Sequence, residues 1–139
     1  MKIRFLLFML ACAVQVSAQI NASRQFSRAD SLRGNLTAFR SCYDINYYHL
    51  DVKVNIDEKF ISGSNLFVFT ALSDFKRLQF DLFANLNIKK VLYKGKELKF
   101  TREFNAVFVD FPKIIRKGSK DEFQVFYSGN PTIARRAPW

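Results

Sequence analysis

Strict alternation of apolar and polar residues is the feature that most constrains the fold. The residue class changes at every position in the run Leu50-Asp51-Val52-Lys53-Val54-Asn55-Ile56-Asp57. Successive side chains of a β-strand point to opposite faces, so this run predicts a strand with one face against a core. A turn-like Asp57-Glu58-Lys59 follows, and a second alternating run begins. The sequence therefore predicts a β-hairpin here.

The same period of two recurs along the rest of the chain. We expect strands over residues 45–56, 61–72, 77–83, 88–93, 97–101, 106–111 and 123–127. Lys94-Gly95-Lys96 is typical of a tight hairpin turn, Pro112 is expected to end a strand, and residues 114–118 are expected to form a loop. About seven short strands at regular spacing predict an all-β fold, an antiparallel sandwich or curved sheet.

The second expected strand has the composition of an interior strand. Leu66-Phe67-Val68-Phe69 is apolar on both faces, which predicts a place inside the sheet with cover on each side. Gly63 predicts either a bulge or a close approach of another backbone. The chain contains 16 phenylalanines, and we interpret this aromatic content as core packing rather than as a ligand cage.

The first 18 residues predict a cleaved secretory signal peptide. A short basic start precedes an apolar core at residues 5–14, and small residues at positions 16–18 suit a signal peptidase. The apolar core is too short for a stable membrane span. We therefore expect export, to the periplasm or the extracellular space. A lipoprotein cysteine at Cys12 is the disfavoured alternative, because Met9 is a poor match to that signal.

The remaining sequence divides into two parts. Residues 19–41 are polar and mixed, and we interpret them as an N-terminal arm with a short helical turn from Ser27 to Arg33, ended by Gly34. Residues 42–139 are expected to form the β domain, which is long enough to bury a core without metals or disulfides. The formal net charge is +10, but the basic residues are scattered over expected turns and polar strand faces. No nucleic-acid partner is therefore expected.

Residues that could perform chemistry are scarce. A zinc site needs several converging ligands, and the sequence offers one histidine, His49, and one cysteine after the signal peptide, Cys42. We interpret Cys42 as a small, partly buried apolar residue and His49 as a polar-face strand residue rather than a triad base. The sequence contains no Gly-rich phosphate loop. We expect no catalytic, cofactor-binding or metal-binding residue in this chain.

The order of several sequence blocks carries a resemblance. These blocks are SRADSLRGNLTAFRSCYDINYYHLDVKV, KFISGSNLFVF, LQFDL, VLYKGKEL and FYSGNPTIARRAPW. Together they resemble the amino-terminal β domain of the gluzincin zinc aminopeptidases, the aminopeptidase N and leukotriene hydrolase group, and in particular its exported bacterial branch. The resemblance covers about residues 27–139, and none of the matching blocks is catalytic.

The resemblance implies a saddle-shaped, mostly antiparallel β domain that precedes a thermolysin-like catalytic domain. In the family that second domain carries H-E-x-x-H, a further zinc-binding glutamate and a G-x-M-E-N loop, none of which occurs in this sequence. We therefore expect the non-catalytic N-terminal domain of an exported zinc metallo-aminopeptidase, either as a truncated product, which the sequence favours, or as a stand-alone fragment. Its partner would be a downstream or separately encoded catalytic domain, which would hold the zinc and cleave N-terminal residues from peptides.

A second hypothesis comes from a different class of protein. A stand-alone exported β-sandwich that binds glycan or protein would need aromatic side chains gathered on one face, and the candidates are Tyr43, Tyr47, Tyr48 and Tyr127. Under the first hypothesis, a chain without its catalytic domain would expose part of an apolar sheet face and the tail Pro138-Trp139.

Overall fold

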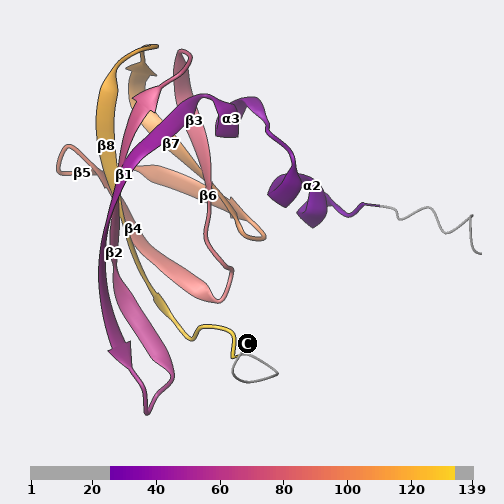
Figure 1. Ribbon diagram of the computed structural model, residues 1–139, viewed down its shortest axis with the longest axis vertical. Coiled ribbons are helices and arrows are strands. Elements are labelled where there is room, and N and C mark those ends of the chain that lie inside the picture. The colour runs from indigo at the N-terminus through magenta and orange to yellow at the C-terminus, as the bar shows by residue number, and fades with distance from the viewer. Residues whose placement is uncertain (1–25, 134–139) are drawn as a thin grey trace, which may run out of the picture.

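The computed structural model describes residues 26–133, which form an open antiparallel β-sandwich (Figure 1). One sheet has five strands in the order β1-β2-β8-β4-β5, and the other has three in the order β3-β7-β6. The bounds of the strands are β1 (Tyr43–Asn55), β2 (Phe60–Ala71), β3 (Phe75–Asp81), β4 (Leu86–Tyr93), β5 (Lys96–Glu97), β6 (Lys99–Glu103), β7 (Ala106–Ile115) and β8 (Lys120–Gly129). The all-β, antiparallel prediction is confirmed.

Two short helices precede the sheets, α2 (Arg28–Gly34) and α3 (Ala38–Ser41). In α2, the Ser27 side chain accepts a hydrogen bond from the Asp30 backbone N–H, and the Asp30 carboxylate accepts from the Ser27 N–H, which is a complete capping box. The expected helical turn is therefore confirmed, although Gly34 is its last residue rather than its cap. Helix α3 was not anticipated.

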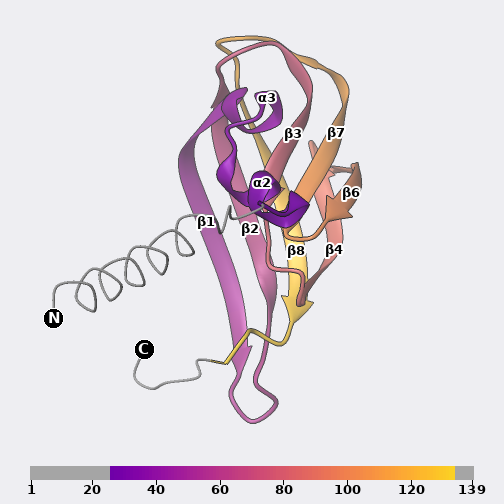
Figure 2. The same ribbon diagram turned by 90° about the vertical axis from the view of Figure 1, so that its right-hand side faces the viewer.

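The helices lie on the outer face of the three-stranded sheet, as Figure 2 shows. Leu32 of α2 is buried against this sheet, and its backbone carbonyl accepts a 3.1 Å hydrogen bond from the Gln79 side chain. Phe39 of α3 packs edge-to-face on Phe108 of β7, with ring centroids 5.8 Å apart. The arm thus covers a face that would otherwise leave apolar side chains in water.

The core lies between the two sheets and is largely aromatic. Phe67 stacks on Phe123 with centroids 4.6 Å apart, and Phe69 is fully buried. The interpretation of the phenylalanines as packing residues is confirmed for those in the core cluster, which are Phe67, Phe69, Phe75, Phe80, Phe111 and Phe123. The inner faces of both sheets therefore define the centre of the fold.

Strand β2 is an interior strand, as predicted, because it pairs with β1 on one side and β8 on the other. The prediction of full cover on both faces was wrong. Phe67 and Phe69 are buried on the inner face, whereas Leu66 and Val68 on the outer face are half-buried. The second sheet covers only the inner face of β2.

Two predicted strand limits were wrong for identifiable reasons. The expected strand 97–101 is divided at Leu98, which is buried and donates its backbone N–H to Val91 O at 2.8 Å. The chain passes there from one sheet to the other. Strand β7 continues through Pro112 to Ile115. The ladder between β7 and β3 shifts register at Pro112, and Pro112 has no paired residue there. The N–H that proline lacks is therefore not required for a ladder hydrogen bond.

Two predictions about glycines are confirmed. Lys94 and Gly95 have positive φ angles of 51° and 76° and connect the paired residues Tyr93 and Lys96, which is the geometry of a tight two-residue hairpin turn. Gly63 marks a close approach between β1 and β2, and the register of that ladder is regular at this residue.

The β1–β2 hairpin extends beyond the three-stranded sheet, and its tip forms one end of the molecule in Figures 1 and 2. Among residues 26–133, no helix is long and apolar enough to cross a membrane. The predicted signal peptide at residues 1–18, with Cys12, and the tail Pro138-Trp139 lie outside the described residues, so those predictions stand untested.

Candidate functional site

The structure does not bring Cys42 and His49 together. Cys42 caps the end of α3 directly before β1, and His49 lies within β1. Seven residues of extended chain span roughly 20 Å, which is far beyond contact distance. His49 is exposed on the outer face of the sheet, opposite Leu66, whereas Cys42 is buried in the core cluster. A nucleophile–base pair of these two residues is therefore excluded by the fold.

Cys42 is an apolar core residue. It is 2% exposed, more deeply buried than the sequence suggested, and its Sγ donates to the Phe39 carbonyl at 3.4 Å. Burial raises the pKa of the thiol to about 11, so the neutral form predominates at physiological pH. A neutral buried thiol is a weak nucleophile and a poor metal ligand.

A zinc ion, which the resemblance implies for the full-length family, does not fit the donor set described here. Among residues 26–133, no three His, Cys, Asp or Glu side chains lie close enough to hold a metal ion. The acidic side chains near the arm are held by arginines, as in the pairs Arg28–Glu103 and Arg40–Asp81. No catalytic step through a metal follows from this part of the chain.

The four tyrosines proposed as a glycan platform do not share a face. Tyr48 packs edge-to-face on buried Phe67, with centroids 5.1 Å apart, and so lies on the inner face. Its neighbour Tyr47 lies opposite Val68 on the outer face. The Tyr43 hydroxyl donates a 2.7 Å hydrogen bond to Gln79 O, and burial raises the pKa of its phenol. Tyr127 borders the inner-face cavity described below.

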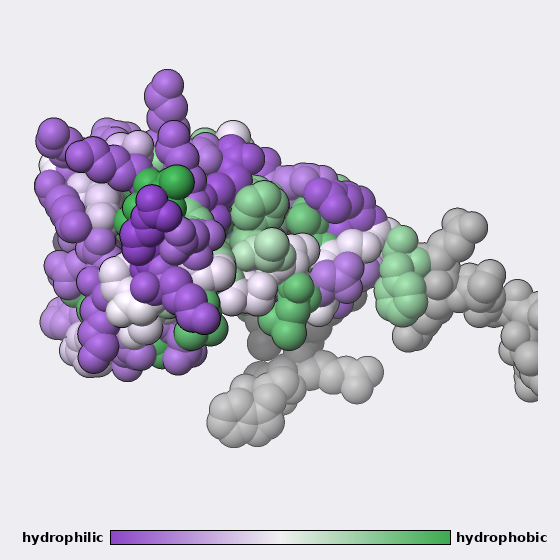
Figure 3. Space-filling model, turned by 90° about the horizontal axis from the view of Figure 1, so that it is seen from above, coloured by the Kyte–Doolittle hydropathy of each residue, from purple (hydrophilic) through white to green (hydrophobic). Residues whose placement is uncertain are grey.

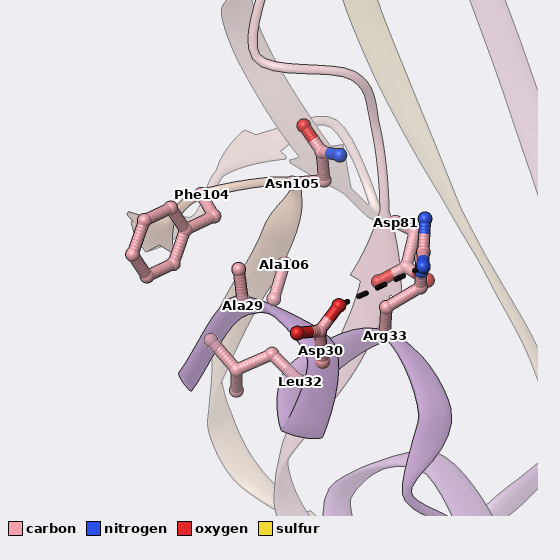
Figure 4. Close-up of a pocket in the computed structure, with 8 residues that line it drawn as sticks. All are labelled: Ala29, Asp30, Leu32, Arg33, Asp81, Phe104, Asn105 and Ala106. Atoms are coloured by element: carbon pink, nitrogen blue, oxygen red, sulfur yellow. Dashed lines mark ion pairs between the residues drawn. The ribbon is translucent and has the colours of Figure 1, made fainter. Parts of the chain in front are cut away.

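A small cavity of about 90 Å³ lies beneath α2 (Figure 4). It has room for a few water molecules. Its charged side chains are already engaged: Asp30 caps the helix and pairs with Arg33 at 3.7 Å, and Asp81 pairs with Arg40. We interpret this cavity as a packing feature of the arm rather than as a binding site.

The largest departure from ordinary burial is on the inner face of β1. Four large apolar side chains there are exposed, as is Ile56 in the turn directly after the strand, and we call these five residues the β1 apolar stripe: Tyr48 at 49%, Leu50 at 62%, Val52 at 42%, Val54 at 62% and Ile56 at 82%. A contiguous exposed row of this kind marks an interaction surface more often than chance exposure.

The topology explains why the stripe is exposed. Residues directly opposite in an antiparallel ladder share a face, and Tyr48 lies opposite the buried Phe67. The same face continues toward the hairpin tip, and the hairpin extends beyond the three-stranded sheet (Figure 2). The stripe is therefore a continuation of the core face without its covering layer.

The stripe leads into a cavity of about 210 Å³ at the open end of the sandwich. Apolar groups from both sheets line it, among them Leu50, Ile61, Leu82 and Leu86. The Oδ1 atom of Asn65 is also buried here, and no described residue donates a hydrogen bond to it. The exposed face is therefore concave at this point and offers one hydrogen-bond acceptor, the Asn65 Oδ1 atom.

The opposite end of the molecule has a different character. Seen from above, away from the hairpin tip, the surface is mostly hydrophilic, with apolar residues in smaller patches (Figure 3). This end differs from the hairpin, where the β1 apolar stripe is exposed. We take the β1 apolar stripe and the adjoining cavity as the candidate functional site.

Solved structures share this fold. A two-domain M1 zinc metallopeptidase variant bound to L-arginine superposes with a TM-score of 0.60 at 20% sequence identity, covering 71% of this chain and 23% of that structure. A variant of the M1 zinc metallopeptidase from Deinococcus radiodurans, bound to a Tyr-Ser-Ala substrate, gives 0.61 at 20% identity, with coverages of 68% and 22%. Yeast LTA4 hydrolase in complex with bestatin gives 0.54 at 14% identity, with coverages of 78% and 17%.

No protein-family model matches the sequence, and no curated protein matches it. The similarity to solved structures, at 14–20% identity, establishes a shared fold, which fits the N-terminal β domain of these peptidases. The chain spans less than a quarter of the length of each of the three structures.

Sequence reasoning named one residue of the stripe, Tyr48, as a candidate for glycan binding, and it expected part of an apolar sheet face to be exposed without assigning residues to that face. It used Leu50, Val52, Val54 and Ile56 as evidence for a strand with one face in a core. The strand is present, but these side chains are exposed. The alternation located these residues on one face of the strand. That this face is exposed follows only from the structure, in which no described sheet covers it.

Proposed function

We propose that this chain is the non-catalytic N-terminal β domain of an exported zinc metallo-aminopeptidase. It scaffolds a catalytic domain that removes N-terminal residues from peptides, and that domain is encoded downstream or separately. The shared fold with M1 zinc metallopeptidases supports the proposal. The observation that carries it is the β1 apolar stripe, a core-type face that no described residue covers.

The docking surface is the inner face of the hairpin. Leu50, Val54 and Ile56 are each more than 60% exposed, so a docking domain would remove most of their apolar area from water. Burial of one such side chain contributes about 1.5–3 kcal/mol, which makes these residues the main source of affinity. In this proposal the catalytic domain binds the zinc ion and the peptide substrates, and this chain binds neither directly.

The nucleotide sequence 3′ of codon 139 and its neighbouring genes provide the first test. We expect a segment that encodes H-E-x-x-H. Co-expression of that segment with the chain should yield a complex that binds zinc and hydrolyses aminoacyl reporter substrates, whereas the chain alone should do neither.

Substitutions on the two faces of β1 provide the second test. The double substitution Leu50→Ser and Val54→Ser should abolish co-purification with the catalytic segment. Tyr47→Ser is the matched control, because Tyr47 is similarly exposed but lies on the outer face. Equal complex formation by both variants, or one zinc bound per chain in the isolated protein, would refute the proposal. The glycan alternative predicts binding on a glycan array instead.

A further inference from the structure

The free edge of β1 is a second unused surface, distinct from its apolar face. β1 is a 13-residue strand that pairs with β2 and has no other strand neighbour in residues 26–133. It contains no proline, which would block further pairing. An exposed edge of this length presents backbone N–H and C=O groups that can pair with another strand.

The sequence of this edge is complementary to itself in the antiparallel sense. If Val52 lies opposite Val52 of a second copy, Leu50 lies opposite Val54 and Asp51 lies opposite Lys53. Apolar residues then meet apolar residues on the inner face, and two Asp51–Lys53 pairs of opposite charge form on the outer face. Such cross-strand pairs stabilise a sheet.

The neighbouring registers are disfavoured. A shift of two residues in one direction places Asp51 opposite Asp51, and a shift in the other places Lys53 opposite Lys53. Like charges directly opposite one another are destabilising. A shift of one residue pairs the apolar face with the polar face. Among these neighbouring registers, the one centred on Val52 alone satisfies both faces.

We propose that the chain forms a two-fold symmetric dimer in which β1 pairs antiparallel with β1 of a second copy, centred on Val52. The two five-stranded sheets join into one continuous sheet. The interface is isologous, because the same segment contributes from each copy. It uses the edge of β1 and leaves the inner face accessible, so it goes beyond the proposed function and does not depend on it.

Charge reversal tests the register with the purified chain alone. We expect sedimentation equilibrium to show a concentration-dependent dimer. Lys53→Asp places two aspartates opposite one another in each symmetric pair and should weaken self-association at least about tenfold, because both pairs become repulsive. Asp51→Lys should weaken it similarly. The chain with both substitutions restores opposite charges and should dimerise like the original.

Mixing gives a second readout. The Asp51→Lys chain and the Lys53→Asp chain should form a heterodimer with each other although neither forms a stable homodimer. Lys113→Asp, an exposed position on β7, is the control for a charge reversal away from the edge and should leave the dimer intact. Circular dichroism checks that each variant is folded. A monomer at millimolar concentration, a dimer unaffected by the single reversals, or failure of the double reversal to restore it would overturn the proposal.

Discussion

Gly63 of β2 lies directly opposite Val52 of β1, and the two backbones approach so closely there that no side chain fits between them. A Cβ atom at residue 63 would overlap the carbonyl oxygen of Asp51 and would lie 3.0 Å from the Val52 Cα. Both atoms belong to the backbone, so neither can rotate away. The hairpin that carries the candidate site therefore requires glycine at this position.

Gly63→Ala should lower the free energy of unfolding by about 1–3 kcal/mol, because the ladder must open to admit a methyl group. Gly34→Ala is the control. Nothing lies within 4 Å of the Cβ position at Gly34, which ends helix α2, so alanine there should be neutral or slightly stabilising. Urea denaturation of both variants measures the difference. A Gly63→Ala chain as stable as the original would show that the close approach is not maintained.

Phe69→Ala should lower the free energy of unfolding by about 3–5 kcal/mol, the range for loss of a buried aromatic ring. Phe69 is fully buried, and its ring packs against those of Tyr43, Phe75, Phe111 and Phe123 at 6.0–6.4 Å. Phe83→Ala serves for comparison, since Phe83 is 69% exposed and should change stability by less than about 0.5 kcal/mol. Thermal denaturation should separate the two variants clearly.

The ion pair between Arg77 and Asp110 predicts a pH-dependent contribution to stability. Two hydrogen bonds of 2.7 and 2.8 Å from Arg77 hold the pKa of the Asp110 carboxyl below its ordinary value. The contribution is therefore present above the unfolded-state pKa of about 3.9 and is lost as pH falls through the folded value. Both side chains are about 40% exposed, which limits the contribution to about 0.5 kcal/mol.

Asp110→Asn should accordingly be about 0.5 kcal/mol less stable than the original chain at pH 6 and nearly equal to it at pH 2. Urea denaturation at both pH values measures this difference. A gap that stays constant with pH would show that the carboxylate charge contributes nothing and that the loss comes from packing.

Much of the fold could be predicted because period-two alternation records which side chains face a core. The turn at Lys94-Gly95 was predictable for a similarly local reason, since glycine suits a positive φ. The change of sheet at Leu98 was not, because the alternation gives no information about which sheet a strand joins. That choice depends on the contact between Leu98 and Val91, seven residues away.

The candidate site was harder to predict from sequence than the fold. Apolar–polar alternation is the same for a strand whose apolar face packs in a core and for a strand whose apolar face binds another domain. Leu50 and Val54 were therefore interpreted as core residues. The difference lies in the length of the second sheet, which ends before the hairpin does (Figure 2). The scarcity of ligands, by contrast, was visible in composition, and the fold separates Cys42, which precedes β1, from His49 within that strand.

Cys42 should react slowly with thiol reagents in the folded chain. Burial raises the pKa of this thiol to about 11, so the thiolate is about a thousandth of the population at pH 8, and the side chain is inaccessible as well. In a Cys12→Ser chain, alkylation by iodoacetamide should accelerate at least about a hundredfold above the urea midpoint. Equal rates in folded and unfolded protein would place the thiol at the surface.

The β1 apolar stripe should make the isolated chain bind hydrophobic dyes while it remains fully folded. Leu50→Ser together with Val54→Ser should reduce 8-anilinonaphthalene-1-sulfonate fluorescence by at least about half, because both side chains are 62% exposed on one face. The same change should leave the unfolding midpoint nearly unaltered, since little buried area is lost. Tyr47→Ser, on the outer face, should retain the dye signal. Dye binding that survives the double substitution would place the principal apolar surface elsewhere, and a large fall in the midpoint would mean that these side chains are buried in solution.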